Sequence, residues 1–92
     1  MRGILIGLIF ALVALPAWAQ TRAENVARCV SRVPDLVIAG CTALIQSGQE
    51  TAEGMSQAYN NRGIIYDEKG LYDRAIADYT QAIFGSSLMA WL

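Results

Sequence analysis

The stretch from Ala58 to Ile83 constrains the fold more than any other part of this 92-residue chain. In its first half, taken with the two preceding residues as Ser56–Lys69, the residues Tyr59, Gly63 and Tyr66 recur at spacings of four and three. Residues at these spacings share one face of an α-helix, because the helix has 3.6 residues per turn. The first half is therefore predicted to be an amphipathic helix.

A second helix is predicted from Tyr72 to Ile83. The residues expected on its core side repeat the spacing of the first helix or lie beside it: Ala75, Ile76, Tyr79, Ala82 and Ile83. The residues expected to face outward are polar, as on an amphipathic surface helix: Asp73, Arg74, Asp78 and Gln81.

Gly70 lies between the two predicted helices. Glycine adopts the left-handed conformation that ends a helix at no steric cost, and so short a link permits only an antiparallel helical hairpin. Gly63, in the middle of the first helix, lowers helix stability by roughly 1 kcal/mol relative to alanine. We attribute this glycine to a close approach of the second helix, with Ala75 and Ala82 facing it.

This pattern resembles the tetratricopeptide repeat, a helical hairpin that recurs about every 34 residues. The residues that match the family pattern in order and spacing are Gly63, Tyr66, Ala75, Tyr79 and Ala82. Two residues depart from it: Arg62 stands where leucine is usual, and Ser87 stands where a closing proline is usual. The resemblance covers Ser56–Ser87 and implies an all-α fold of antiparallel helical hairpins, an α-solenoid fragment of about one and a half repeats.

Residues 20–55 are predicted to form a lead-in hairpin, a degenerate repeat, with helices at Thr21–Arg32 and Asp35–Gln46 separated by Val33-Pro34. The apolar residues available for burial are Ala23, Val26, Ala27 and Val30 in the first helix and Leu36, Val37, Ala39, Ala43 and Leu44 in the second. The segment DLVIAGCTALI (residues 35–45) can be laid over DRAIADYTQAI (residues 73–83), which favours a second helix of a preceding repeat. Chance agreement between two amphipathic helices is the alternative.

Cys29 and Cys41 are the two cysteines of the chain. If the chain turns near Pro34, each lies about six residues from the turn, at a similar height in an antiparallel pair of helices. A disulfide is the leading interpretation for an exported chain, and it would contribute roughly 2–4 kcal/mol. Two buried free thiols are the alternative.

The first residues have the layout of a secretory signal peptide, predicted to span residues 1–19. Arg2 precedes an apolar run, Ile4–Leu15, which is shorter than the about 20 residues that a helix needs to cross a bilayer. The small residues of Ala17-Trp18-Ala19 favour cleavage after this triplet. We expect an exported protein, periplasmic or secreted, with a bacterial periplasm as the favoured compartment. A buried helix or an uncleaved membrane anchor is the alternative.

The composition argues against most catalytic and nucleic-acid-binding classes. The chain has no histidine, two cysteines do not make a structural zinc site, and the sequence holds no glycine-rich phosphate loop. Asp67 and Glu68 are adjacent and diverge around a helix, so they make a poor acid–base pair. Without Arg2 the net charge is −2, with no basic run for nucleic acid. We predict no enzyme activity, cofactor or metal, and membrane contact only in transit through the signal peptide.

The resemblance implies a protein–protein interaction module that binds a protein or peptide, of unknown identity, in a groove lined by the first helix of each repeat. The residues expected in this groove are Gln57, Asn60, Ile64 and Asp67, with Glu68 at the rim. The residues expected in the repeat core are Tyr59, Gly63, Tyr66, Ala75, Tyr79 and Ala82.

Residues 88–92 form an almost wholly apolar tail, which is predicted to follow a helix end at Phe84–Ser87. Repeat arrays normally close with a polar face, and an exposed apolar segment is typical of an interface. Two alternatives to partner binding therefore stay open: a homo-oligomer held together through this tail, and a truncated fragment of a longer repeat array.

Overall fold

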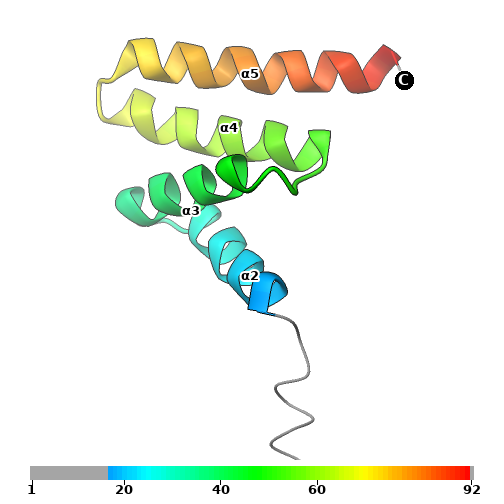
Figure 1. Ribbon diagram of the computed structural model, residues 1–92. Helices are drawn as coiled ribbons and strands as arrows, with labels where there is room; N and C mark the ends of the chain where they lie inside the picture. The colour runs from blue at the N-terminus through cyan, green and yellow to red at the C-terminus, as the bar shows by residue number, and fades with distance from the viewer. Residues whose placement is uncertain (1–16, 92) are drawn as a thin grey trace, which may run out of the picture.

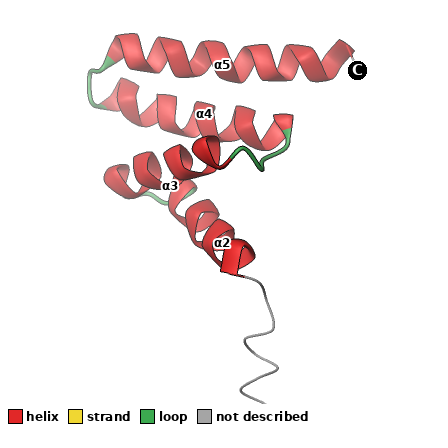
Figure 2. Ribbon diagram, in the orientation of Figure 1, coloured by secondary structure: helices red, strands yellow, loops and turns green. Residues whose placement is uncertain are grey.

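The computed structural model of the chain describes residues 17–91, with side chains described for residues 21–85. Within this range the chain forms helices joined by short loops (Figure 2). The helices are α2 (Ala17–Cys29), α3 (Pro34–Ser47), α4 (Ala52–Glu68) and α5 (Tyr72–Trp91). The all-α class is therefore confirmed. No helix in the described range is long and apolar enough to span a membrane.

The helices form two antiparallel hairpins, α2–α3 and α4–α5, which stack side by side (Figure 1). Helix α4 lies between α3 and α5, and α2 packs on α3 and on one side of α4. Among the described helices, α5 packs on α4 alone. Each hairpin thus contacts its neighbour in sequence, which is the arrangement of an α-solenoid and confirms the predicted architecture.

The turn between α4 and α5 is a Schellman motif centred on Gly70. This glycine has a φ of 77°, in the left-handed region that a side chain would strain. The N–H groups of Gly70 and Leu71 donate to the carbonyl oxygens of Asp67 and Tyr66, at 2.9 and 2.8 Å. These bonds satisfy the last carbonyl groups of α4 and reverse the chain, as the sequence predicted for this glycine.

Helix α4 begins at Ala52, earlier than the predicted Ser56. The side-chain oxygen of Thr51 accepts a hydrogen bond from the N–H of Gly54 at 3.0 Å. Thr51 is therefore the N-cap, and α4 includes residues 52–55, which precede the predicted helix.

The predicted helix end at Phe84–Ser87 is wrong, because α5 continues to Trp91. The early start of α4 gives α5 a longer surface to pack on: a Cβ at Gly85 would lie 3.6 Å from the carbonyl oxygen of Ala52. The predicted tail, residues 88–92, is thus the end of α5 as far as Trp91. Its last residue lies outside the described residues, as do residues 1–16 of the predicted signal peptide.

Helix α2 begins before the predicted Thr21 and ends at Cys29, before the predicted Arg32. The N–H of Ser31 donates to the carbonyl oxygen of Arg28, and the Ser31 hydroxyl oxygen accepts from the N–H of Val33, both at 3.0 Å. These local bonds close a turn before the proline that starts α3.

The principal core lies between the two hairpins. Its buried residues are Cys29, Val37, Cys41, Leu44, Ala58 and Ile65, with Val26, Ile38 and Ile45 packed against them. Of the apolar residues predicted for burial in the lead-in hairpin, several are exposed: Ala23, Ala27, Val30, Leu36 and Ala39.

The reason is the close crossing of α2 over α3 at Gly40, which selects the buried faces. A Cβ at Gly40 would lie only 2.5 Å from the Cβ of Arg28 and 2.6 Å from the backbone oxygen of Asn25. The face of α2 that includes these two residues therefore turns toward α3, and the apolar residues to either side of it turn toward solvent.

The close approach predicted at Gly63 is present, but Asp78 and Tyr79 make it. A Cβ at Gly63 would lie 3.0 Å from a ring carbon of Tyr79 and 3.2 Å from the Cβ of Asp78, and these two residues lie nearer than Ala75 or Ala82. The two alanines are buried elsewhere along the α4–α5 contact, with 2% and 7% of their surface exposed.

The orientations predicted for three residues of α5 are wrong. Asp78, predicted to face outward, is 4% exposed, and Ile76 and Ile83, predicted on the core side, are 62% and 67% exposed. The cause is Arg62 of α4, which binds the Asp78 carboxylate and so turns this side of α5 inward. The two isoleucines then lie on the side turned away from α4.

Candidate binding groove

A groove follows the contact between α2 and α4. It consists of two shallow clefts of about 110 and 220 Å³, which share Cys29, Val30 and Asn61 as lining residues. The smaller cleft is lined mainly by α2 and the first half of α4, and the larger by the end of α2 and the second half of α4. We call this feature the α2–α4 groove.

The exposed apolar side chains of the groove come from both helices. Val30, directly after α2, is 67% exposed and Ile64 of α4 is 40% exposed. Val26 lines the same groove further toward the start of α2. Because these side chains keep solvent-accessible surface in the folded chain, a bound segment would gain free energy by covering them.

Amide side chains lie between the apolar positions. Gln57 and Asn61 line the groove from α4. The Nδ2 of Asn61 donates a hydrogen bond to the carbonyl oxygen of Cys29 at 3.3 Å, so this amide holds the end of α2 against α4. Gln57 is exposed, and its amide can both donate to and accept from the backbone of an extended peptide.

An ion pair closes one end of the groove. The Nε and Nη2 of Arg22 lie 2.7 and 3.1 Å from the two carboxylate oxygens of Glu50, a bidentate arrangement. The hydrogen bond to Glu50 and its negative charge raise the pKa of Arg22 above its ordinary value. The pair fixes the loop before α4 onto α2, and it separates the groove from a cleft of about 230 Å³ between α2 and α3.

A disulfide lies beneath the groove. Cys29 and Cys41 are bonded, with their Cα atoms 4.6 Å apart, as the sequence predicted. Cys41 is fully buried, and Cys29 is 4% exposed at the base of both clefts. The bond joins α2 to α3, so it fixes one wall of the groove covalently. Within the described range, no group of three or more His, Cys, Asp or Glu side chains is placed to hold a metal ion.

A polar network centred on Arg62 holds the other wall. Its Nε and Nη2 each lie 2.8 Å from an Asp78 carboxylate oxygen, and its Nη1 lies 3.0 Å from the hydroxyl oxygen of Thr42. The guanidinium also lies over the rings of Tyr59 and Tyr66, at 5.5 and 5.7 Å from their centroids. One side chain of α4 therefore bonds to α5 and to α3. The hydrogen bond to Asp78 raises the pKa of Arg62 above its ordinary value.

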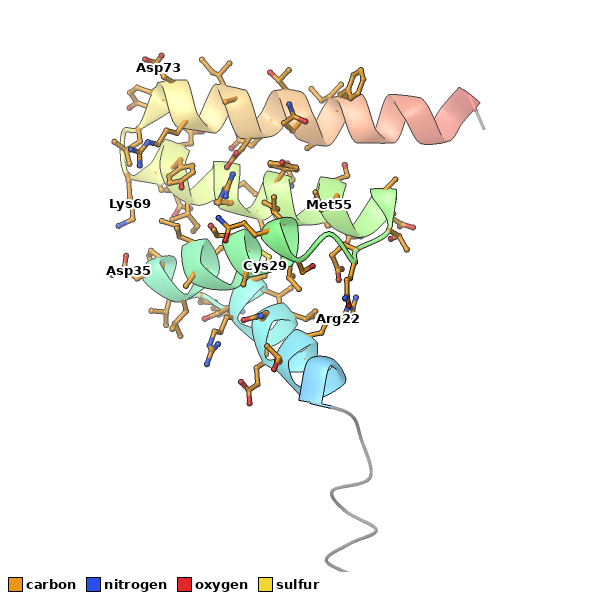
Figure 3. All side chains as sticks on the ribbon, viewed as in Figure 1. Arg22, Cys29, Asp35, Met55, Lys69 and Asp73 are labelled. Carbon is orange, nitrogen blue, oxygen red and sulfur yellow. A yellow bond between two sulfur atoms is a disulfide. The ribbon has the colours of Figure 1, made fainter. Side chains whose placement is uncertain are left out.

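A further ion pair links the two hairpins near the turns. Figure 3 shows Lys69, after α4, and Asp35, at the start of α3, on the same edge of the molecule. The Lys69 Nζ lies 3.2 Å from an Asp35 carboxylate oxygen. Because the Asp35 side chain is 88% exposed, we expect this pair to add little to stability.

The structure places the residues predicted for the groove in two sets. Gln57 and Ile64 line the α2–α4 groove. Asn60, Asp67 and Glu68 are exposed on α4 and line neither cleft of the groove.

Asn61 is a polar groove residue of α4 that the sequence interpretation did not include. The spacing of Gly54, Gln57, Asn61 and Ile64, which is three, four and three, could have identified it, because these residues share one helical face. Of the residues predicted for the repeat core, Gly63, Ala75 and Ala82 are buried. The three tyrosines of that set are half-buried: Tyr59, Tyr66 and Tyr79.

Residues 56–83, which comprise most of α4 and the first part of α5, match the family model of the tetratricopeptide repeat. The chain therefore contains a tetratricopeptide repeat, as its residue pattern indicated. Repeats of this family are typically interaction modules that engage other proteins. No curated protein and no solved structure shows a significant match to the chain.

Proposed function

We propose that the chain is an exported, non-catalytic interaction module that binds an extended segment of another protein in the α2–α4 groove. The observation that carries this proposal is the position of the groove. It runs along the first helix of the tetratricopeptide repeat and along the first helix of the preceding hairpin. A groove shared by two hairpins offers a longer contact than one helix could.

The lining residues favour a peptide with apolar side chains along one edge. Val30 and Ile64 would contact such side chains from opposite walls, and Gln57 would bond to the peptide backbone. Asn60 and Asp67, exposed on the same helix, would extend the contact along the outer rim. Glu68 would add a further polar contact at that rim.

Export is supported by two features of different kinds. The first 19 residues have the order of a secretory signal peptide, with a basic start, an apolar run and small residues at the end. The chain also contains a disulfide, a bond that persists mainly in oxidising compartments such as the periplasm. Mass spectrometry of the chain expressed in a bacterium should give an N-terminus at Gln20 and an intact disulfide. A chain that retains Met1 would contradict export by this route.

The groove can be tested without a known partner. A displayed library of random peptides would be selected against the full chain, and the selected peptides measured by titration. Val30→Glu and Ile64→Glu place a charge in the groove and should weaken binding by about tenfold or more, as expected for central contacts.

Leu36→Glu is the matched control. Leu36 is 42% exposed, close to the 40% of Ile64, and it lines neither cleft of the groove. This variant should bind like the wild type. Equal loss of affinity in the control and in Ile64→Glu would show that the peptides bind elsewhere.

A further inference from the structure

Helix α5 carries an apolar face that no described helix covers. Tyr72, Ile76, Ile83 and Phe84 are 60% to 67% exposed, although they are large and apolar. Of these, Ile76 and Ile83 share one side of α5 with Thr80, because their spacing is four and three. We call Ile76, Thr80 and Ile83 the α5 outer face.

The same three residue types occur in α3, where a helix covers them. When residues 35–45 are laid over residues 73–83, Ile38, Thr42 and Ile45 of α3 correspond to the α5 outer face. Ile38 and Ile45 are half-buried against the core cluster that includes Ala58 and Ile65 of α4.

Thr42, the middle of these three residues of α3, is also covered. The Thr42 hydroxyl accepts a hydrogen bond from Arg62 of α4. This Ile–Thr–Ile face is thus the one that α3 uses to receive an antiparallel helix. On α5 the equivalent face is open.

The charge pattern indicates what kind of helix the open face would accept. From Ala75 to Leu92 the sequence holds a single charged residue, Asp78, which is buried and bonded to Arg62. The α5 outer face therefore presents no charge. A second copy of this face meets it without like-charge repulsion, whereas a charged helix would have to desolvate its charges.

The α5 outer face carries isoleucine at both ends, so two copies of it can pair symmetrically. Ile76 and Ile83 are equally distant from the midpoint between Tyr79 and Thr80. In an antiparallel pair related by a twofold axis at this midpoint, Ile76 of one copy meets Ile83 of the other, and the reverse contact is identical. We propose that two copies of the chain form a homodimer through an antiparallel pair of α5 helices, centred on Ile76, Thr80 and Ile83.

The dimer contact leaves the α2–α4 groove open. The groove is lined by residues of α2, α3, α4 and the adjoining loops, and by none of α5. The contact therefore does not depend on the proposed peptide binding, and each function can be disturbed separately.

The test is the mass of the full chain in solution, measured by light scattering or sedimentation across the micromolar range. The wild type should be a dimer. Ile76→Glu/Ile83→Glu places glutamate opposite glutamate in the antiparallel pair and should raise the dimer dissociation constant by about tenfold or more. Ile76→Lys/Ile83→Glu introduces the same number of charges but places lysine opposite glutamate, so it should retain the dimer, more weakly at high salt.

Two controls keep the test independent of folding. Ile76 and Ile83 are both more than 60% exposed, so circular dichroism of the double variants should show wild-type helix content. Val33→Glu, at a 51% exposed position outside α5, should leave the dimer intact. Thr80→Cys should form a disulfide-linked dimer on oxidation, whereas Gln46→Cys, on exposed α3 surface, should not.

Three results would overturn the proposal. The first is a wild-type chain that is monomeric throughout the range, and the second is equal weakening by the two double variants. The third is cross-linking that is no faster at position 80 than at position 46.

Discussion

Replacement of Arg62 by leucine should destabilise the chain, even though leucine is the residue that the repeat family usually has at this position. The Arg62 side chain is 16% exposed and the Asp78 side chain 6% exposed, and two bonds of 2.8 Å join them. Arg62→Leu removes the counter-ion and leaves the Asp78 carboxylate buried in α5 without its charge partner.

The magnitude follows from the burial of the pair. Removal of one member of a buried ion pair costs about 3–5 kcal/mol, because the remaining charge is desolvated without compensation. Loss of the ring contacts of Tyr59 and Tyr66 adds about 0.5–1 kcal/mol each. Burial of the new leucine returns about 2 kcal/mol. We therefore expect a net loss of about 3 kcal/mol in the free energy of unfolding.

The assay is urea unfolding followed by circular dichroism, with the disulfide intact in every sample. Asp78→Ala should cost less, about 2 kcal/mol, because the flexible Arg62 stem lets its guanidinium reach water and keep its bond to Thr42. The double variant Arg62→Leu/Asp78→Ala should lie within about 1 kcal/mol of the wild type, since apolar replacement of a whole buried pair is often neutral. The two single effects are thus expected not to add.

Two outcomes would refute this reasoning. If Arg62→Leu were as stable as the wild type, the buried Asp78 carboxylate would not need its counter-ion for the chain to stay folded. If the double variant were no more stable than Arg62→Leu, the loss would come from Arg62 contacts other than the one to Asp78.

Three further predictions concern single contacts. Gly40→Ala should lower the free energy of unfolding by about 3 kcal/mol, because its Cβ would lie 2.6 Å from backbone atoms of α2 that cannot move away. Gly63→Ala should lower it by about 1 kcal/mol, since its Cβ would meet a Tyr79 ring at 3.0 Å and the ring can shift. Urea unfolding of both variants checks this order. Removal of the disulfide by Cys29→Ala/Cys41→Ala should lower the free energy of unfolding by about 3 kcal/mol, for a sequence separation of 12. Amide hydrogen exchange should accelerate first in α2, and protection of α2 equal to that of α4 would contradict this. Burial raises the pKa of Tyr79 above 10.0, with smaller contributions from nearby carboxylates. The folded state therefore holds this proton more tightly than the unfolded state, and stability should fall as the pH rises above 10.0. Tyr79→Phe should show a smaller fall in the urea midpoint over the same pH change.

The parts of the fold that depend on local chemistry could be predicted from the sequence. The helical spacing around Gly63 and the left-handed turn at Gly70 are set by neighbouring residues, and both occur in the structure. The pairing of Cys29 with Cys41 followed from their similar distance to one turn. None of these predictions required knowledge of how one hairpin lies on the other.

The burial of Asp78 could not be read from the pattern of α5, because it depends on a residue sixteen positions earlier in the chain. A signal was present nevertheless. An arginine at a position where the family has leucine requires a carboxylate close by if it is buried, and Asp78 lies on the facing helix.

Of the groove residues predicted on α4, Gln57 and Ile64 line the α2–α4 groove. Which side of α4 meets α2 depends on the crossing of α2 over α3, and that crossing is set by contact with Gly40. This is a contact between elements that the periodicity of a single helix does not encode. Asn61 therefore lines the two clefts, whereas Asn60 is exposed on α4 outside them.

The bonds of Arg62 also determine where the two stacked hairpins can be divided into modules. Repeat stability is commonly separated into a term for each repeat and a term for each interface. Arg62 contributes to both, since it binds Asp78 within its own hairpin and Thr42 in the preceding one. A recombination boundary placed between α3 and α4 would separate Arg62 from Thr42. The smallest block that could be transplanted with this network complete is the three-helix segment from α3 to α5.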